Sequence, residues 1–124
     1  MIRGIGIDIV RTSRLDAWLG DEGLLERFFH PDELAAVFER GHDKVLSLAA
    51  RFAAKEAFGK ALGTGLMHFN LREVQVLNDE LGKPDMVLHG RARQAFEACG
   101  GVSVFVSLAH ERDNAVAVVV IEGA

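Results

Sequence analysis

The stretch from about His42 to Leu62 limits the possible folds of this 124-residue chain more than any other stretch. It is rich in alanine and contains no proline. It also ends at Gly63, a residue type that is favoured just past the end of a helix. The stretch therefore predicts one long helix, around which the other elements have to pack.

The first ten residues predict a β-strand, because apolar side chains alternate along them. One face of this strand would carry Ile5, Ile7 and Ile9, and the other would carry Gly4, Gly6, Asp8 and Val10. Between Thr12 and about Arg40, apolar residues recur at helical spacing with polar breaks. This pattern predicts several short helices, one of which would have Pro31 at its first position.

The C-terminal half predicts strands separated by turns and one short helix. Residues 71–78 and 84–89 would form two strands around a turn, with Pro84 at the start of the second. Residues 91–99 predict a helix, and residues 102–109 and 115–121 predict a final strand pair whose last strand lies in the sheet interior. Because helices and hairpins are segregated, we predict an α+β fold in which a mainly antiparallel sheet packs against one long helix and several short helices.

Composition narrows the possible classes of protein. The chain is 49% hydrophobic and 26% charged, which is typical of a folded domain, and no linker or repeat divides residues 1–124 into more than a single domain. Its net charge of −4 argues against nucleic acid or an anionic membrane as a partner of the whole surface. No apolar run reaches the ~18 residues of a membrane span, and the single cysteine cannot form an internal disulfide. We therefore expect a cytoplasmic protein.

A carboxylate lies on the apolar stripe of the predicted long helix. The stripe carries Val45, Leu48, Ala49, Phe52 and also Glu56. One interpretation is an ion pair with Lys60, four residues further on, and the other is a ligand-binding carboxylate. If the helix packs on the glycine face of the first strand, Asp8 and Glu56 would meet and would need a cation between them. Two hard oxygen ligands suit Mg²⁺, which takes water and substrate phosphate at its other positions.

Basic residues surround Glu56 in a chain that is acidic overall. Between residues 44 and 64, four cations accompany one acid: Lys44, Arg51, Lys55 and Lys60. This imbalance predicts a local anion site. Arg51 and Lys55 are four residues apart, so they would either share an anion or be solvated, and solvation is the common outcome for Lys55. Lys60 with the following Gly63-Thr64-Gly65 can hold a phosphate, or these glycines can form a helix cap and turn.

Better-known motifs do not fit this chain. The third glycine of a dinucleotide fingerprint is replaced by Ile9. Gly59-Lys60 does not belong to a phosphate-binding Walker loop, because Ala61 stands where that loop has Ser or Thr and Ala54 stands where it has its first glycine. The histidines lack the paired spacing of a zinc site, and no serine lies in a Gly-x-Ser-x-Gly nucleophile motif. His110 alone stands out, because it follows an apolar strand at a turn, where it would either contact a ligand or be an ordinary surface histidine.

Two segments resemble the motifs of a known family. Residues 4–10 read Gly-Ile-Gly-Ile-Asp-Ile-Val, and residues 51–65 read Arg-Phe-Ala-Ala-Lys-Glu-Ala-Phe-Gly-Lys-Ala-Leu-Gly-Thr-Gly. Together they resemble the holo-acyl-carrier-protein synthases, the small bacterial type of 4′-phosphopantetheinyl transferase, and the resemblance covers the whole chain. It implies the fold of that family and a Mg²⁺-dependent transfer of 4′-phosphopantetheine from coenzyme A to a serine of an apo acyl carrier protein. Adenosine 3′,5′-bisphosphate would be released, and the product would support fatty acid biosynthesis.

The resemblance also implies roles for individual residues. Asp8 and Glu56 would bind Mg²⁺, and Lys60 would stabilise the transferring phosphoryl group. Glu56 would accept the serine proton, either directly or through a metal-bound water. The coenzyme A site would be lined by Arg51, Lys60, Thr64, Gly65, Pro84 and His110. The acidic carrier protein would contact Arg14 and Arg27. A homotrimer with active sites between subunits is implied as well, so that Asp8 and Glu56 would face phosphate-binding residues of a neighbouring chain.

The chain departs from the family pattern at two places. Many members have Ser-x-Ser-His near the end, whereas residues 107–110 read Ser-Leu-Ala-His, so a hydroxyl contact to the nucleotide would be missing at Ala109. Three acidic residues lie near Arg14 in the sequence: Asp16, Asp21 and Glu22. They reduce the positive charge of the surface that would contact an acidic carrier.

Two other functions are compatible with the same residues. A Mg²⁺-dependent nucleotide pyrophosphatase would activate water in place of a carrier serine and would modify no protein. A non-enzymatic oligomeric binding module would contain Glu56 and Lys60 merely as a structural pair.

Overall fold

The computed structural model describes residues 1–39 and 43–124. Arg40 and His42, where the predicted boundary between the short helices and the long helix falls, lie outside the described residues. The strands are β1 (Ile2–Arg11), β2 (Val74–Asn78), β3 (Pro84–Leu88), β4 (Gly101–Glu111) and β5 (Asn114–Gly123). The α-helices are α1 (Ser13–Asp16), α2 (Glu22–Phe28), α3 (Pro31–Glu39), α4 (Lys44–Leu62) and α5 (Gly90–Ala98), with short 3-10 helices η1 (Ala17–Gly20) and η3 (Leu71–Glu73). The predicted α+β class is confirmed.

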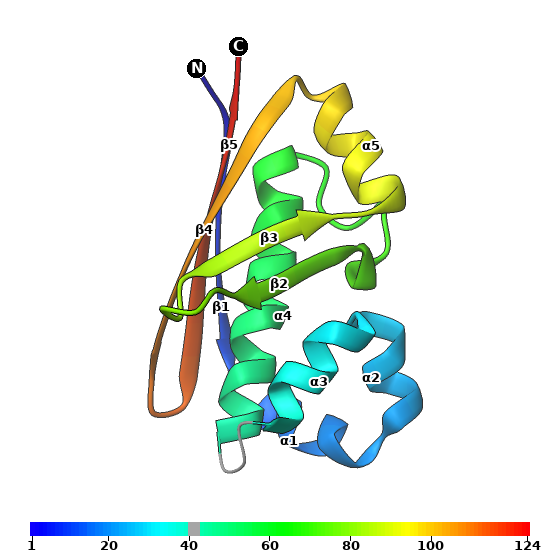
Figure 1. The fold of residues 1–124 in the computed structure, drawn as a ribbon, viewed down its shortest axis with the longest axis vertical. Helices are drawn as coiled ribbons and strands as arrows, with labels where there is room; N and C mark the ends of the chain where they lie inside the picture. The colour runs from blue at the N-terminus through cyan, green and yellow to red at the C-terminus, as the bar shows by residue number, and fades with distance from the viewer. Residues whose placement is uncertain (40–42) are drawn as a thin grey trace.

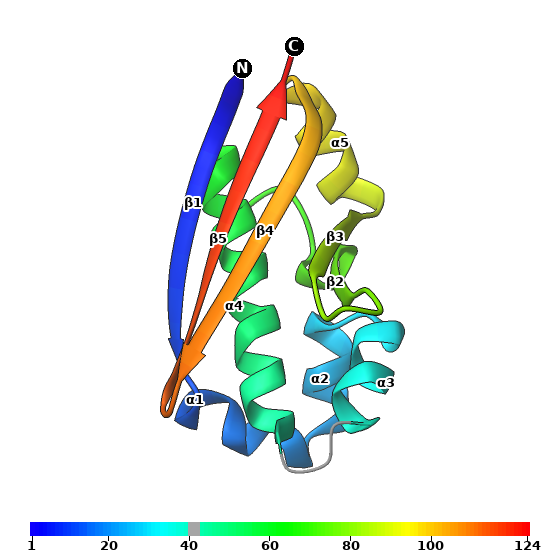
Figure 2. The ribbon, with the colours of Figure 1, turned by 60° about the vertical axis from the view of Figure 1, so that its left-hand side comes forward.

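The strands form two antiparallel sheets instead of the one that we predicted. The larger sheet has the strand order β1-β5-β4, so the prediction that the last strand lies in the interior is confirmed (Figures 1 and 2). The smaller sheet is the hairpin β2-β3, in which Val74 pairs with Leu88 and Asn78 pairs with Pro84. This hairpin lies on the other side of α4 from β1 (Figure 2). Among the described residues, β3 approaches β4 without joining the larger sheet.

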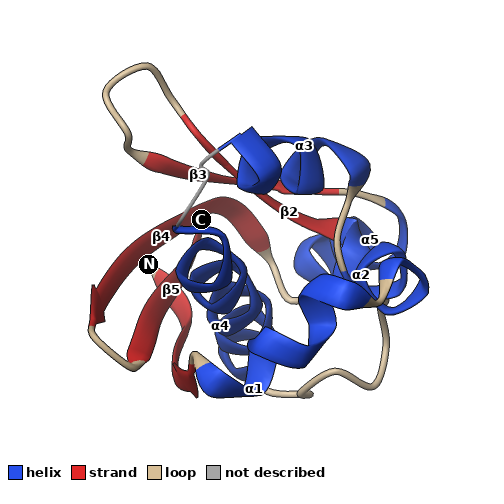
Figure 3. Ribbon diagram, turned by 90° about the horizontal axis from the view of Figure 1, so that it is seen from below, coloured by secondary structure: helices blue, strands red, loops and turns tan. Residues whose placement is uncertain are grey.

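Helix α4 is the centre of the molecule and is buried on nearly every side. The three-stranded sheet covers one side of it, and the β2-β3 hairpin and the shorter helices cover the others (Figure 3). It packs on β1 through glycines, since a Cβ atom at Gly4 or Gly6 would lie 1.9 Å from the carbonyl oxygen of Ala61 or Ala57. Only a strand without side chains at these two positions can approach the helix so closely. This close approach places Asp8, the next residue on the same face of β1, beside α4.

The outer face of the three-stranded sheet is not covered by any described part of the chain. It carries Ile5, Ile7, Ile9 and Phe105, each between 54% and 63% exposed, and the register places Val116, Val118 and Val120 of β5 between them. The inner face of β5 presents Ala115, Ala117, Val119 and Ile121, all fully buried against the core. The described helices include none that is long and apolar enough to cross a lipid bilayer.

Candidate active site

Asp8 on β1 and Lys60 on the last turn of α4 form an ion pair. The Nζ atom of Lys60 donates hydrogen bonds to Asp8 Oδ1 and to the carbonyl oxygen of Ile7, both at 3.0 Å. The Lys60 side chain is 54% exposed and that of Asp8 is 16% exposed. The ammonium group of Lys60 is therefore held against β1, while about half of the side chain stays exposed to solvent. Its partner is Asp8, so the interpretation of Lys60 as a structural partner of Glu56 is wrong.

Glu56 lies one turn before Lys60 and is half-buried next to Asp8. Burial raises the pKa of the Glu56 carboxyl group above its ordinary value, and the negative charge of Asp8 raises it further. Arg14 and Lys60 act in the opposite direction. Within residues 1–39 and 43–124, Glu56 has no ion-pair partner. The site therefore presents a carboxylate whose proton affinity is increased and whose oxygens are open to a ligand.

The oxygen donors at this place fit a hard divalent cation. Asp8 and Glu56 repel each other electrostatically, and a cation between them would remove the repulsion. No group of three or more acidic, histidine or cysteine side chains in the described part of the chain can hold a metal. Two carboxylates are enough for Mg²⁺ when water and substrate phosphate complete its octahedral shell.

Three of the predicted coenzyme A residues line one cavity of about 270 Å³. Arg51 and Ser47 of α4 form one side, Asn78, Gly82 and Pro84 of the hairpin form another, and Leu108 and His110 of β4 complete it. Ala109 pairs with Val116 and so lies on the outer face of the sheet, away from this cavity. A serine hydroxyl group at position 109, which we expected to be missing from the nucleotide site, would therefore lie on the outer face of β4 and not in this cavity.

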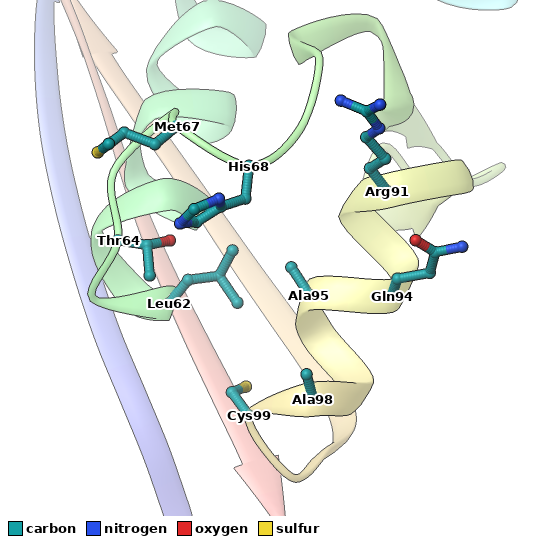
Figure 4. A pocket seen from close by; sticks show the side chains of 9 residues that line it. All are labelled: Leu62, Thr64, Met67, His68, Arg91, Gln94, Ala95, Ala98 and Cys99. Atoms are coloured by element: carbon teal, nitrogen blue, oxygen red, sulfur yellow. The ribbon is translucent and has the colours of Figure 1, made fainter.

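The remaining predicted residues of the coenzyme A site lie elsewhere. Gly63 and Gly65 have positive φ angles of 83° and 65°, and the Gly65 amide donates to the carbonyl oxygen of Gly59, so both glycines act as a helix cap and turn. Thr64 lines a separate groove of about 640 Å³ between this turn and α5. Figure 4 shows the side chain of His68 between Thr64 and Ala95 of α5.

One chain does not bring the acid site and the 270 Å³ cavity together. Arg51 and Lys60 are nine residues apart on α4, and at about 100° per residue they lie on opposite faces of the helix. Arg51 donates to the carbonyl oxygen of Val76 on β2, whereas Lys60 donates to that of Ile7 on β1. The two halves of the predicted site therefore face away from each other within one subunit.

The expectation that Lys55 is solvated is wrong. Its side chain is fully buried, and Nζ donates to Glu33 Oε1 at 2.6 Å, to the carbonyl oxygen of Leu71 at 3.0 Å and to that of Val74. Burial lowers the pKa of Lys55 to about 8, although Glu33 opposes this shift. The sequence reasoning missed Glu33. The available signal was its position three residues after His30, where its carboxylate accepts the His30 backbone amide.

The two arginines predicted to contact a carrier protein, Arg14 and Arg27, pack against an aromatic cluster. The Arg14 guanidinium carbon lies 5.5 Å from the centre of the Phe52 ring, and that of Arg27 lies 5.7 Å from the centre of the Phe28 ring. Trp18 contacts both rings, with centroid distances of 5.2 Å to Phe52 and 5.3 Å to Phe28. Both arginines are exposed, so their charges are available to an acidic partner.

Comparison with known proteins gives the same family as the sequence motifs. A family model described as the 4′-phosphopantetheinyl transferase superfamily matches residues 4–119. The holo-[acyl-carrier-protein] synthase of Treponema denticola is 54% identical over 123 residues, which cover 99% of this chain and 100% of that relative. The enzyme of the same name from Geobacter sp. strain M21 is 42% identical over 125 residues, with 98% and 99% covered.

Solved structures agree with these relatives. The crystal structure of holo-[acyl-carrier-protein] synthase from Neisseria meningitidis superposes with a TM-score of 0.87 at 36% identity, covering 98% of this chain and 99% of that one. The structure of the Bacillus anthracis synthase in complex with coenzyme A (3′,5′-ADP) has a TM-score of 0.82 at 33% identity, covering 100% and 99%. The chain therefore belongs to the holo-[acyl-carrier-protein] synthase family of the 4′-phosphopantetheinyl transferase superfamily.

Proposed function

We propose that this chain transfers the 4′-phosphopantetheine group of coenzyme A to a serine of an apo acyl carrier protein and releases adenosine 3′,5′-bisphosphate. The observation that carries the proposal is the meeting of Asp8, Glu56 and Lys60 where β1 packs on α4, in a chain of this family. We place the reaction in the cytoplasm, where it supports fatty acid biosynthesis, and we assign it to residues 1–124 acting as a single domain.

Asp8 and Glu56 would hold Mg²⁺ together with the pyrophosphate of coenzyme A. When bound, the ion neutralises charge on the phosphate oxygens and makes the phosphorus a better electrophile. Lys60 already lies against Asp8 with its ammonium group half-exposed, so it can turn from this carboxylate to a phosphate oxygen. Its role is to stabilise the charge that builds up on the transferring phosphoryl group.

Glu56 is the base in this proposal. Burial increases the proton affinity of the Glu56 carboxyl group, so Glu56 would accept the serine proton, directly or through a water molecule, more readily than an exposed glutamate. The serine oxygen then forms a bond to the β-phosphorus, and the bond from that phosphorus to the bridging oxygen breaks. The proton ends on Glu56, and the electron pair of the broken bond leaves with adenosine 3′,5′-bisphosphate.

The nucleotide half of coenzyme A would occupy the cavity at Arg51, Pro84 and His110 of a neighbouring subunit. Since Arg51 and Lys60 lie on opposite faces of α4, one ligand can use both only if a second chain supplies one of them. Thr64 and Gly65, at the end of α4 that carries Lys60, would contribute from the acid side. The exposed outer face of the three-stranded sheet supports such an assembly, because an apolar face of this kind is typical of an interface between subunits. We propose a homotrimer with its active sites between subunits.

The acidic carrier protein would dock on Arg14 and Arg27. Arg14 influences Glu56 electrostatically, so a carrier held by Arg14 would be close to the proposed base. The aromatic rings beneath both guanidinium groups limit their motion and prepare them for a partner.

Intact-mass spectrometry of an apo carrier protein incubated with the chain, coenzyme A and Mg²⁺ tests the proposed activity. The carrier should gain the mass of one phosphopantetheine group, and Asp8→Ala and Glu56→Ala should abolish the gain while remaining folded. If phosphopantetheine were released free and the carrier stayed unmodified, the chain would be a nucleotide pyrophosphatase. If neither product formed with any carrier, a non-enzymatic binding function would replace the proposal.

A further inference from the structure

Strand β2 pairs with β3 along one edge, and along its other edge charged side chains take the place of a neighbouring strand. Lys55 donates to the carbonyl oxygen of Val74, and Glu33 Oε2 accepts the Val76 amide at 3.0 Å. Arg51 Nε donates to the carbonyl oxygen of Val76 at 3.1 Å. We call Glu33, Arg51 and Lys55 the β2 clamp. It satisfies the edge of a strand that would otherwise be left with buried, unpaired polar groups.

The ion pair in this clamp is completely enclosed. The side chains of Glu33 and Lys55 are each 0% exposed, and the three hydrogens of the Lys55 ammonium have three acceptors. Both oxygens of Glu33 also accept backbone amides, from His30 and from Val76. A buried ion pair is weak evidence for stability, because apolar side chains of the same volume often do as well. The geometry that the pair imposes on β2 is the property that apolar side chains would not reproduce.

The clamp sets the distance between α4 and the hairpin, and the 270 Å³ cavity lies between these same two elements. Ser47 and Arg51 on α4 face Asn78, Gly82 and Pro84 on the hairpin across it. Arg51 Nη2 donates to Asn78 Oδ1 at 3.0 Å, and Asn78 Nδ2 donates to the carbonyl oxygen of Gly82 at 2.9 Å. The hydrogen bonds therefore run from the buried ion pair along β2 to the turn that forms the cavity wall.

We infer that Glu33 and Lys55 are positioning residues for the nucleotide half of coenzyme A: they hold β2 and its turn at the separation from α4 that the cavity requires. This inference rests on the proposed function of the cavity. Lys55 is the immediate neighbour of Glu56, yet its ammonium group points to the hairpin and does not face the acid site. Loss of the clamp should therefore weaken binding of the nucleotide and leave the transfer step at Glu56 nearly intact.

The test replaces both charges at once, so that neither is left buried without a partner. Glu33→Gln/Lys55→Met keeps the side-chain volumes similar and removes the Lys55 hydrogen bond to β2. We expect the KM for coenzyme A to rise about tenfold, the effect of losing roughly one hydrogen bond. The KM for the carrier protein and kcat at saturating coenzyme A should stay within about twofold of the unsubstituted chain. The matched control is Arg93→Met/Glu97→Gln, which removes an exposed ion pair on α5 and should change neither constant.

Calorimetric titration with adenosine 3′,5′-bisphosphate separates the possible failures. If the unsubstituted chain binds this nucleotide and the double variant binds it about tenfold more weakly, the inference is supported whether or not a carrier is modified. If both bind it equally, or if kcat falls while the KM for coenzyme A is unchanged, the inference is wrong. If the unsubstituted chain binds no nucleotide and modifies no carrier, the proposed function fails first and this inference fails with it.

A second variant covers the case in which the double variant does not fold. Glu33→Gln/Lys55→Gln also removes both charges together, and it keeps an amide donor at position 55 that can still reach the carbonyl oxygens of Leu71 and Val74. It should raise the KM for coenzyme A about threefold with kcat unchanged. A chain that folds with these substitutions and shows an unchanged KM would contradict the positioning role of Glu33 and Lys55.

Discussion

The contact between β1 and α4 determines the burial and the electrostatic environment of Asp8, Glu56 and Lys60. The same contact half-buries Glu56, brings Asp8 close to it and supplies Lys60 with the carbonyl oxygen of Ile7. The two carboxylates and the one ammonium group do not neutralise each other completely. A divalent cation that carries a phosphate can therefore bind at this site.

The raised pKa of Glu56 predicts how the free energy of unfolding depends on pH. Because its folded-state pKa is raised, the folded state binds this proton more tightly than the unfolded state, and the free energy of unfolding falls as pH rises from about 4.3 to the raised value. Glu56→Gln should therefore unfold at a higher urea concentration than the unsubstituted chain at pH 8 in EDTA. The difference should vanish near pH 3, and equal midpoints at both pH values would contradict the shift.

Two lysines of α4 should respond differently to the same substitution. Lys55→Met leaves the Glu33 carboxylate buried without a cation and should lower the free energy of unfolding by about 3–5 kcal/mol. Lys60→Met removes an ion pair whose lysine is 54% exposed and should lower it by less than about 1 kcal/mol. Urea denaturation of both variants at pH 7 measures the contrast, and similar losses would show that Lys55 is not enclosed as described.

The environments of single residues could be predicted from the sequence only in part. Asp8 and Glu56 could be paired because the glycine pattern of β1 and the helical stripe of α4 are both local and periodic. Lys55 could not be placed, because its burial depends on Glu33, which lies 22 residues away on another helix. Spacing along one helix shows which side chains share a face, and it does not show which element will cover that face.

At the scale of elements, the close packing of β1 on α4 is what holds the acid site together. Gly6→Ala would place a methyl group 1.9 Å from the carbonyl oxygen of Ala57, so the strand would have to move away from the helix. We expect the free energy of unfolding to fall by about 1–3 kcal/mol or more, and transfer activity to fall with it.

Gly20→Ala is the matched control, because a Cβ atom there would contact nothing within 4 Å. Its thermal midpoint and activity should equal those of the unsubstituted chain. If Gly6→Ala were equally harmless, the close approach of β1 to α4 would not be what positions Asp8.

Most elements were predictable because their signals are local. Pro84 begins β3, Gly63 ends α4 with a positive φ angle, and the final strand pair lies where its apolar runs predicted. The division into two sheets was not predictable, since it depends on α4 and its charged side chains occupying the place beside β2. Long-range pairing of this kind leaves no pattern in the strand itself.

At the scale of the whole molecule, the uncovered face of the three-stranded sheet predicts self-association. Ile7→Lys places a charge in the middle of this face, where Ile7 is paired with Val118 and is 59% exposed. The variant should fold as a monomer, measured by sedimentation or light scattering, and should lose transfer activity. Leu81→Lys, at a turn where the side chain is 95% exposed, should keep both the assembly and the activity. A fully active Ile7→Lys monomer would contradict the shared site.

The most direct test of the central claim, that two chains share each active site, is transfer activity after two inactive variants are mixed and allowed to exchange subunits. Asp8→Asn damages the acid side and His110→Ala damages the nucleotide side. Mixed at equal amounts, they should recover about a quarter of the activity of the unsubstituted chain, because one interface in four joins two intact sides. If the mixture stays as inactive as each variant alone, while mass spectrometry shows that subunits have exchanged, each site belongs to a single chain and the account is wrong.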